Sequence, residues 1–281
     1  MALNAEALLA HSFAPTRHAY TERDAILYAL GLGLGADPCD AADLAFLDER
    51  QLRVLPSYAV TLASPGMWIR DERFGVDFKR LVHSEQFARF HAPLPPKGEI
   101  IGTGGVESLT DRGEGRGAVL TVARQIADAQ SGALHCELRQ TLLLRGDGGF
   151  GGPAPARQDD PVPARVPDYQ CSVPTSRRAA LIYRLSGDWN PLHLDPAFAR
   201  TAGFDRPILQ GLASYGMAGI AVARATGADP SSITTLGCRF AGVVMPGDTL
   251  AFSIWRTDDG FAFAANVGDR IVLDRGVMTI G

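Results

Sequence analysis

A glycine- and proline-rich stretch divides the chain into two parts. Residues 146–167 contain five glycines and five prolines and show no hydrophobic periodicity. Such a stretch favours an extended connector over a packed element, because proline restricts the backbone and lacks an N–H donor. In a chain of 281 residues this pattern predicts two domains. We place them at residues 1–150 and 169–281, with a linker at 151–168.

The two parts resemble each other. Residues 25–31 read AILYALG and residues 180–187 read ALIYRLSG, and a Pro/Gly turn precedes a strand-like segment later in each part. Chance similarity between two amphipathic helices is one interpretation, and duplication of a unit of one helix and an antiparallel sheet is the other. Because runs of strands follow a helix in both parts, we expect an α+β fold rather than a doubly wound one.

Local patterns predict the elements of each part. Thr21 with Asp24 three residues later is typical of a capping box at the start of a helix. Strands are then predicted near 57–62, 74–80, 99–109, 117–128 and 133–145. The second part is predicted to hold helices over 177–187 and 209–226, and strands near 233–241, 248–256, 260–267 and 270–280.

The composition excludes several classes of function. The formal net charge is −4, without a compensating block of lysine and arginine, which argues against nucleic-acid binding. The longest uncharged run, residues 207–223, falls short of the roughly 20 residues that span a bilayer. The N-terminus lacks the pattern of a signal peptide, and the four cysteines stand singly. We therefore expect a cytoplasmic protein with no membrane span and no nucleic-acid partner.

One segment of the second part carries a candidate acid/base pair. Residues 183–195 read YRLSGDWNPLHLD, and a helix that stops before the proline places Asp188, Asn190 and His193 on an irregular loop. An aspartate and a histidine five positions apart on such a loop can face one small volume. Histidine exchanges protons near neutral pH, and aspartate can orient it or act beside it.

The same residues have structural alternatives. Asp188 can cap the next turn, Asn190 before Pro191 can form a turn, and His193 can pack in the core. A metal site built from Asp188, His193 and Asp195 is a weaker alternative, because the ligands are few and no second histidine lies at a helical spacing. The residues alone leave these interpretations open.

A second candidate feature lies just downstream. Residues 204–212 read FDRPILQGL, so a helix is expected to start near Gly211. Free N–H groups at the start of a helix can hold a carbonyl oxygen that gains negative charge, and glycine lets a substrate approach the backbone closely. Close packing of helix and sheet at Gly211 is the structural alternative, and the two roles are compatible.

Residues 183–193 resemble the signature of the hydratase 2 family of MaoC-like enoyl-CoA hydratases. The nearest likeness is to the hydratase domain of peroxisomal multifunctional β-oxidation enzymes. Further family landmarks lie in the expected order at 20–31, 55–56, 83–86, 93–95, 148–152 and 239–240. The resemblance implies a double hotdog fold, in which two helices are each wrapped by an antiparallel sheet. The second unit would be catalytic, and the first would make room for the acyl chain.

The resemblance implies a hydro-lyase reaction on an acyl-CoA substrate. Water would add reversibly to a trans-2-enoyl-CoA to give the (3R)-3-hydroxyacyl-CoA, with no metal or redox cofactor. Asp188 and His193 would be the acid/base pair, Asn190 would help to hold the water, and the N–H of Gly211 would polarise the thioester carbonyl. A homodimer is implied as well.

Other residues are placed near the substrate by the same resemblance. They are Gln210, Leu212, Arg239, His83 and Glu85. Support of the site is implied for His83 and Glu85 rather than chemistry. Because CoA is polyanionic and the chain is slightly acidic, positive charge must be concentrated locally, and Arg239 is the first candidate.

Three positions depart from the family pattern. Gln210 stands where the family usually has histidine, Gly242 where it has lysine, and Ser84 where it has glycine. Glutamine cannot carry a proton at neutral pH, and loss of the lysine removes a point charge suited to a CoA phosphate. A non-catalytic acyl-CoA-binding subunit is therefore one alternative, and a hotdog acyl-CoA thioesterase is another. The intact Asp-x-Asn-Pro-x-His motif favours the hydratase.

Overall fold

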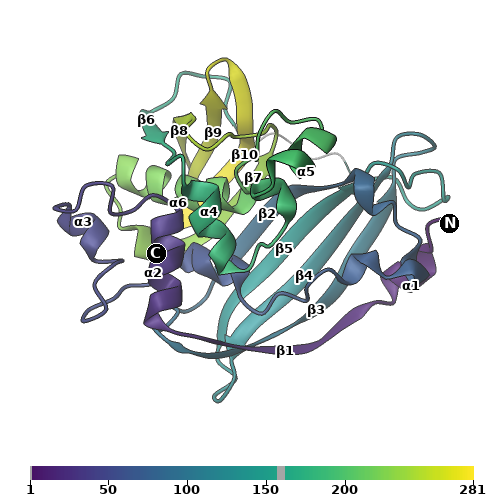
Figure 1. Ribbon diagram of the computed structural model, residues 1–281, viewed down its shortest axis with the longest axis horizontal. Coiled ribbons are helices and arrows are strands. Elements are labelled where there is room, and N and C mark those ends of the chain that lie inside the picture. The colour runs from purple at the N-terminus through teal and green to yellow at the C-terminus, as the bar shows by residue number, and fades with distance from the viewer. Residues whose placement is uncertain (1, 157–161) are drawn as a thin grey trace.

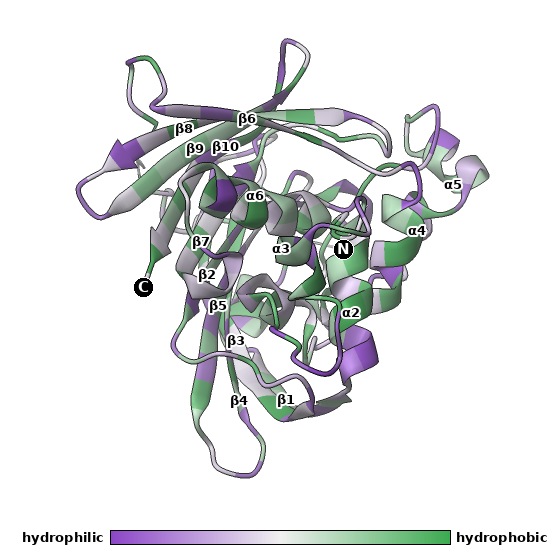
Figure 2. Ribbon diagram, turned by 90° about the vertical axis from the view of Figure 1, so that its left-hand side faces the viewer, coloured by the Kyte–Doolittle hydropathy of each residue, from purple (hydrophilic) through white to green (hydrophobic). Residues whose placement is uncertain are grey.

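The computed structural model describes residues 2–156 and 162–281 and shows one large sheet that curves around the helices (Figures 1 and 2). The strands are β1 (Ser12–Tyr20), β2 (Leu81–Phe90), β3 (Gly98–Asp111), β4 (Ala118–Asp128), β5 (Leu134–Leu144), β6 (Tyr169–Pro174), β7 (Ile233–Phe240), β8 (Thr249–Thr257), β9 (Gly260–Val267) and β10 (Arg270–Ile280).

Helical elements of two kinds connect these strands. The α-helices are α1 (Ala5–Leu9), α2 (Glu22–Gly31), α3 (Ala41–Leu44), α4 (Ala179–Tyr183), α5 (Pro196–Thr201) and α6 (Gly211–Ala225). The 3₁₀ helices are η1 (Pro56–Thr61), η2 (Trp68–Arg70), η3 (Glu72–Phe74), η4 (Phe78–Arg80), η5 (Arg184–Ser186), η6 (Pro191–His193) and η7 (Pro230–Ser232).

Both parts of the chain contribute to the same sheet. Within the described residues, ten strands pair in the order β1-β3-β4-β5-β2-β7-β10-β9-β8-β6, and all neighbours are antiparallel. The first part supplies β1 to β5 and the second part supplies β6 to β10. Strands β2 and β7 join the two halves, with Glu85 opposite Arg239. The predicted α+β class is confirmed.

The concave side of the sheet holds the main core and its helices. Helix α6 is the most deeply enclosed of them, because residues 213–223 are all buried. Helix α4 packs on α2 so closely that a methyl group at Gly31 would lie 3.1 Å from the Cα of Tyr183. This contact fixes the end of α4, and with it the loop that follows, against the first part of the chain.

Two predicted strands are wrong. Residues 57–61 belong to η1, and residues 74–80 contain the last residue of η3 and all of η4 instead of a strand. Pro56 to Val60 are all buried, and periodicity cannot distinguish a fully buried strand from another buried segment. Arg124 on β4 also donates to the carbonyls of Val60, Leu62 and Ala63 at 3.1–3.2 Å, so a side chain takes the bonds that a strand partner would take.

The remaining predicted elements agree with the structure. The capping box is present, since the N–H and the hydroxyl of Thr21 donate to Asp24 Oδ2 at 2.8 and 2.7 Å. The helix predicted over 177–187 is α4 followed by η5, and it ends at Gly187 with φ of 106°. Among the described residues, no helix is long and apolar enough to cross a membrane.

Only part of the proposed linker lies within the described residues. Residues 151–156 have no regular secondary structure, whereas residues 157–161 lie outside the described residues. The division into residues 1–150, 151–168 and 169–281 therefore stays a prediction.

Candidate active site

The loop after α4 is shaped by its own polar side chains. Gly187 takes a left-handed conformation, which ends the helix and turns the chain. Asp188 Oδ1 accepts the N–H of Asn190 at 3.2 Å, and Asn190 Oδ1 accepts the N–H of Leu192 at 3.1 Å, which caps η6. The structural roles foreseen for Asp188 and Asn190 are thus real, and they leave Asp188 Oδ2 available.

His193 is buried behind this loop with a defined ring orientation. Its Nδ1 lies 2.9 Å from the carbonyl oxygen of Ile208. Because a carbonyl oxygen can only accept, Nδ1 carries the proton, and Nε2 of the neutral ring carries a lone pair. That Nε2 lies 3.6 Å from Asp188 Oδ2. Two acceptors at this separation do not bond to each other directly, but both can accept from one molecule between them.

The start of α6 lies close to the same loop. Ile208 connects the two segments, because its carbonyl holds His193 and its N–H donates to the carbonyl of Leu192 at 3.3 Å. Gly211 is the first residue of α6 and is exposed, so its N–H has no partner inside the helix. The Phe240 ring would lie 3.3 Å from a Cβ at Gly211, so the position is also tightly packed on one side. The structure places Asp188 beside His193 and ties His193 to Ile208, three residues before the start of α6 at Gly211.

The neighbours of Gly211 face the interior. Gln210 is only 1% exposed, and its Nε2 donates to the carbonyl of Ala180 at 3.1 Å, which fixes the start of α6 to α4. Its Oε1 is buried and has no hydrogen-bond partner among the described residues. Leu212 is partly buried and packs against the core. Gln210 and Leu212 therefore support the start of α6 from the protein interior.

His83 and Glu85 lie on opposite faces of the sheet. A register shift in β2 sets His83 opposite Leu142 but Glu85 opposite Thr141, so a bulge turns one side chain inward and the other outward. His83 packs edge-on against Phe240, with 5.0 Å between the ring centroids. Burial lowers the pKa of His83 to about 4, so the ring is neutral at pH 7. His83 therefore supports Phe240, which in turn packs on Gly211.

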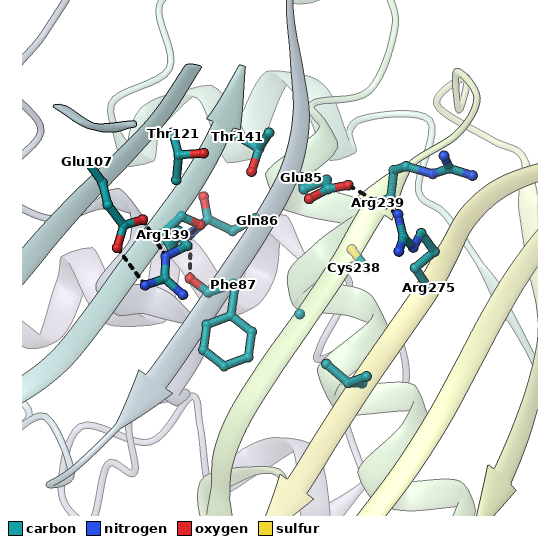
Figure 3. A pocket seen from close by; sticks show the side chains of 12 residues that line it. Glu85, Gln86, Phe87, Glu107, Thr121, Arg139, Thr141, Cys238, Arg239 and Arg275 are labelled. Atoms are coloured by element: carbon teal, nitrogen blue, oxygen red, sulfur yellow. Dashed lines mark hydrogen bonds and ion pairs between the residues drawn. The ribbon is translucent and has the colours of Figure 1, made fainter. Parts of the chain in front are cut away.

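Glu85 and Arg239 line a groove on the outer face of the sheet, of about 530 Å³ (Figure 3). Arg239 is held there by Asp274, with a Nε–Oδ1 distance of 2.7 Å. Across the groove, Arg139 pairs with Glu107 at 2.6 Å. The sheet separates these residues from His193, so the structure does not bring Glu85 and Arg239 to the acid/base pair. Their expected place near the substrate is wrong for a physical reason: sequence order does not show where a bulge moves side chains from one face of a strand to the other.

The weaker metal hypothesis finds no support in the geometry. Asp195 is the N-cap of α5, where its Oδ1 accepts the N–H of Ala197 at 2.7 Å. Among the described residues, no cluster of three or more histidine, cysteine, aspartate or glutamate side chains has the arrangement of a metal site.

Gly242 occupies a position where a side chain does not fit. A Cβ there would lie 2.6 Å from the carbonyl oxygen of Ile271, because β10 approaches closely. Arg270 fills the adjacent space and donates to the carbonyl of Val243. With the backbone in this position, a lysine at 242 would clash with β10.

The most informative contact that the sequence did not indicate is the one between His193 and Ile208. It involves a backbone carbonyl, and a carbonyl that orients a side chain leaves no signal in residue type. The sequence also does not indicate that Phe240 packs against Gly211, although residues 239–240 resemble a family landmark.

Comparisons with known proteins show the family of the chain. Residues 18–146 match the family described as the MFE-2 hydratase 2 N-terminal domain, and residues 159–272 match the MaoC like domain. The chain is 42% identical to the 3-hydroxyacyl-thioester dehydratase Y of Mycobacterium tuberculosis, with 94% of each chain covered. It is 38% identical to the peroxisomal enoyl-CoA hydratase 2 of Arabidopsis thaliana, with 90% of this chain and 87% of that one covered.

Solved structures show the same architecture. The MaoC-like dehydratase from Phytophthora capsici superposes with a TM-score of 0.85 at 29% identity and covers 99% of both chains. A Mycobacterium tuberculosis protein described as a double hotdog fold is only 17% identical, with a TM-score of 0.55 over 96% of this chain and 95% of that one, and shows the fold alone. The chain has the double hotdog fold.

Proposed function

The chain belongs to the family of MaoC-like hydratase 2 enzymes, and we propose that it adds water reversibly to trans-2-enoyl-CoA, giving the (3R)-3-hydroxyacyl-CoA. The observation that carries the proposal is the pair of acceptors, Asp188 Oδ2 and His193 Nε2, 3.6 Å apart beside the exposed start of α6. The hydro-lyase activity follows from this pair together with the family.

The pair of acceptors is suited to hold and activate one water molecule. A water that donates one O–H to Asp188 Oδ2 and the other to His193 Nε2 has its lone pairs directed away from the pair, toward the substrate. The oxygen bonds to C3 while one O–H proton passes to the pair, and the pair returns one proton to C2. The Ile208 carbonyl keeps Nε2 available for this exchange by holding the proton on Nδ1.

The start of α6 supplies the second requirement of the reaction. Attack at C3 moves negative charge onto the thioester oxygen, so a donor must face that oxygen. The N–H of Gly211 has no partner within the helix, and the positive end of the helix dipole adds to its effect. Addition of water changes no overall oxidation state, and two side chains carry the protons, so the proposed reaction includes neither a redox cofactor nor a metal.

Substitution of each partner tests the proposal. Asp188→Asn and His193→Ala should each lower kcat for hydration of a trans-2-enoyl-CoA by about 10²- to 10⁴-fold, because general acid–base catalysis is worth that much. Asp195→Asn is the matched control, since Asp195 caps α5 on the same segment. Circular dichroism should be unchanged in all three. Full activity in both Asp188→Asn and His193→Ala contradicts the assignment, and chiral analysis of the product tests the (3R) configuration.

The alternatives remain distinguishable in the same assay. Release of free CoA would indicate a thioesterase, and acyl-CoA binding without turnover would indicate a binding subunit. The two departures that suggested a binding subunit have structural roles here: Gln210 fixes the start of α6 to α4, and Gly242 lets β10 approach closely.

We also propose a homodimer in the cytoplasm. Exposed leucines on α2, α4 and η5, namely Leu30, Leu181 and Leu185, support self-association. The four cysteines are free, which supports a reducing compartment. Light scattering of the purified protein tests the first point, and cell fractionation tests the second.

A further inference from the structure

The segment that carries the proposed acid/base pair is rich in arginines. Residues 177–206 contain five arginines against three aspartates, in a chain whose net charge is −4. Within the described residues, none of these five guanidinium groups makes an ion pair or a hydrogen bond: Arg177, Arg178, Arg184, Arg200 and Arg206. Elsewhere arginines are commonly paired, as Arg139 is with Glu107 and Arg224 with Asp43. The positive charge of this segment is therefore available to a ligand.

Arg184 is the best placed of these groups. Its guanidinium lies over the Trp189 ring, 4.5 Å from the ring centroid. Its Nε is buried and has no hydrogen-bond partner among the described residues. A guanidinium that is partly buried without an anion pays a desolvation cost, which an incoming anion can offset.

Trp189 presents an unusual surface beside the acid/base pair. It follows Asp188 directly in the chain, and it is 61% exposed. Tryptophan is seldom left so open, since its ring carries a large apolar area. With Arg184 covering the ring on one side, a flat ligand can stack on what remains exposed.

We propose that Arg184 and Trp189 bind the adenosine diphosphate part of CoA, with the indole stacking on the adenine and the guanidinium holding a phosphate. The inference rests on the proposed function, which places the thioester at Gly211 and the reacting carbons at Asp188, the residue directly before Trp189. Aromatic stacking and arginine–phosphate contacts are the interactions that such a group requires. Arg239, the earlier candidate, is on the outer face of the sheet and is held by Asp274.

Binding of CoA itself tests this site without relying on catalysis. Titration calorimetry with free CoA should show about tenfold weaker binding for Trp189→Ala and for Arg184→Gln, whereas Trp189→Phe should retain most of the affinity. Arg116→Gln is the matched control, because Arg116 is an exposed arginine in the turn between β3 and β4. It should bind CoA as the wild type does. The salt dependence of binding should be weaker for Arg184→Gln, because one phosphate contact is lost.

Kinetics with a truncated substrate separate nucleotide binding from damage to the loop. The ratio of kcat/KM for an enoyl-CoA to kcat/KM for the matching enoyl-pantetheine thioester should fall about tenfold in Trp189→Ala and in Arg184→Gln. An equal loss with both substrates overturns the proposal, and so does unchanged binding of CoA in both variants. If the wild type binds CoA through this pair but hydrates no enoyl-CoA, the proposed function fails while this site stands.

Discussion

His83 and His193 show how burial sets the role of a histidine. His193 keeps Nε2 beside Asp188, whereas Nε2 of His83 lies 3.1 Å from the carbonyl of Glu85 and the ring is packed under Phe240. Burial lowers the pKa of His83 from 6.5 to about 4. His83 is therefore neutral at pH 7 and supports the site by packing against Phe240.

Stability should therefore fall as the pH falls from about 6.5 toward 4. The unfolded chain binds a proton at His83 in this range and the folded protein does not, so protonation favours unfolding. The lost stability is of the order of 2 kcal/mol. Urea unfolding at several pH values measures it, and His83→Gln should flatten the curve between pH 6.5 and 4. A His83→Gln curve as steep as that of the wild type contradicts the prediction.

Gly242 gives a second prediction at the scale of one residue. Because a Cβ there would lie 2.6 Å from the carbonyl oxygen of Ile271, Gly242→Ala should destabilise the fold by about 1–3 kcal/mol. Gly227→Ala provides a comparison without this clash, since nothing lies within 4 Å of its Cβ position, although its positive φ adds some strain. The free energy of unfolding in urea measures both. A larger loss for Gly227→Ala would show that backbone conformation outweighs the clash.

Among the elements, η1 depends most on a single side chain. Arg124 donates to three carbonyls in the segment from Val60 to Ala63, and burial lowers its pKa to about 10. Arg124→Met should cost about 3 kcal/mol of unfolding free energy, because it leaves buried carbonyls without donors. Arg139→Met should cost less than about 1 kcal/mol, since its pair with Glu107 is exposed. Equal losses in urea unfolding would contradict this account of η1.

The elements that the sequence predicted share strong local patterns. Strands β3, β4, β5 and β7 to β10 follow alternation and turn residues, and α2 follows its capping box. The sequence did not predict β1, β2 and β6. Strand β2 is central, so exposure does not explain why it was not predicted. Strands β1 and β6 are the two edges of the sheet, where Pro15 and Pro174 are tolerated because one side needs no ladder bonds. Edge strands are half exposed, so their patterns are weaker.

At the scale of the whole molecule, the positions of the candidate site residues depend on how the two halves of the sheet pair. The motif from Asp188 to His193 was found because its residues are close in sequence. The sequence did not predict that Glu85 and Arg239 face the outer side of the sheet. Their position follows from the bulge in β2 and from the pairing of β2 with β7. Pairing across the halves joins residues more than 140 positions apart, and no local pattern encodes that.

The two parts should unfold together even though the sequence predicts two domains. Strands β2 and β7 continue one sheet, and Asp43, only 5% exposed, accepts from Arg224 Nη2 and from the N–H of Gly35, both at 2.6 Å. If one half unfolded alone, the β2–β7 pairing would be lost and a sheet edge would be left unpaired. The contact between Asp43 and Arg224 would also be broken. Variants retaining only Trp68 or only Trp255, one in each part, should therefore report the same urea midpoint by fluorescence.

Breaking the Asp43–Arg224 contact should affect both reporters alike. Arg224→Met leaves the Asp43 carboxylate without its cation, which should lower the free energy of unfolding by about 2 kcal/mol and shift both midpoints equally. Arg50→Met is the control, since its pair with Asp48 is open to solvent and should cost less than about 1 kcal/mol. If the Trp255 midpoint moves and the Trp68 midpoint does not, the parts fold independently, and the shared sheet does not couple them.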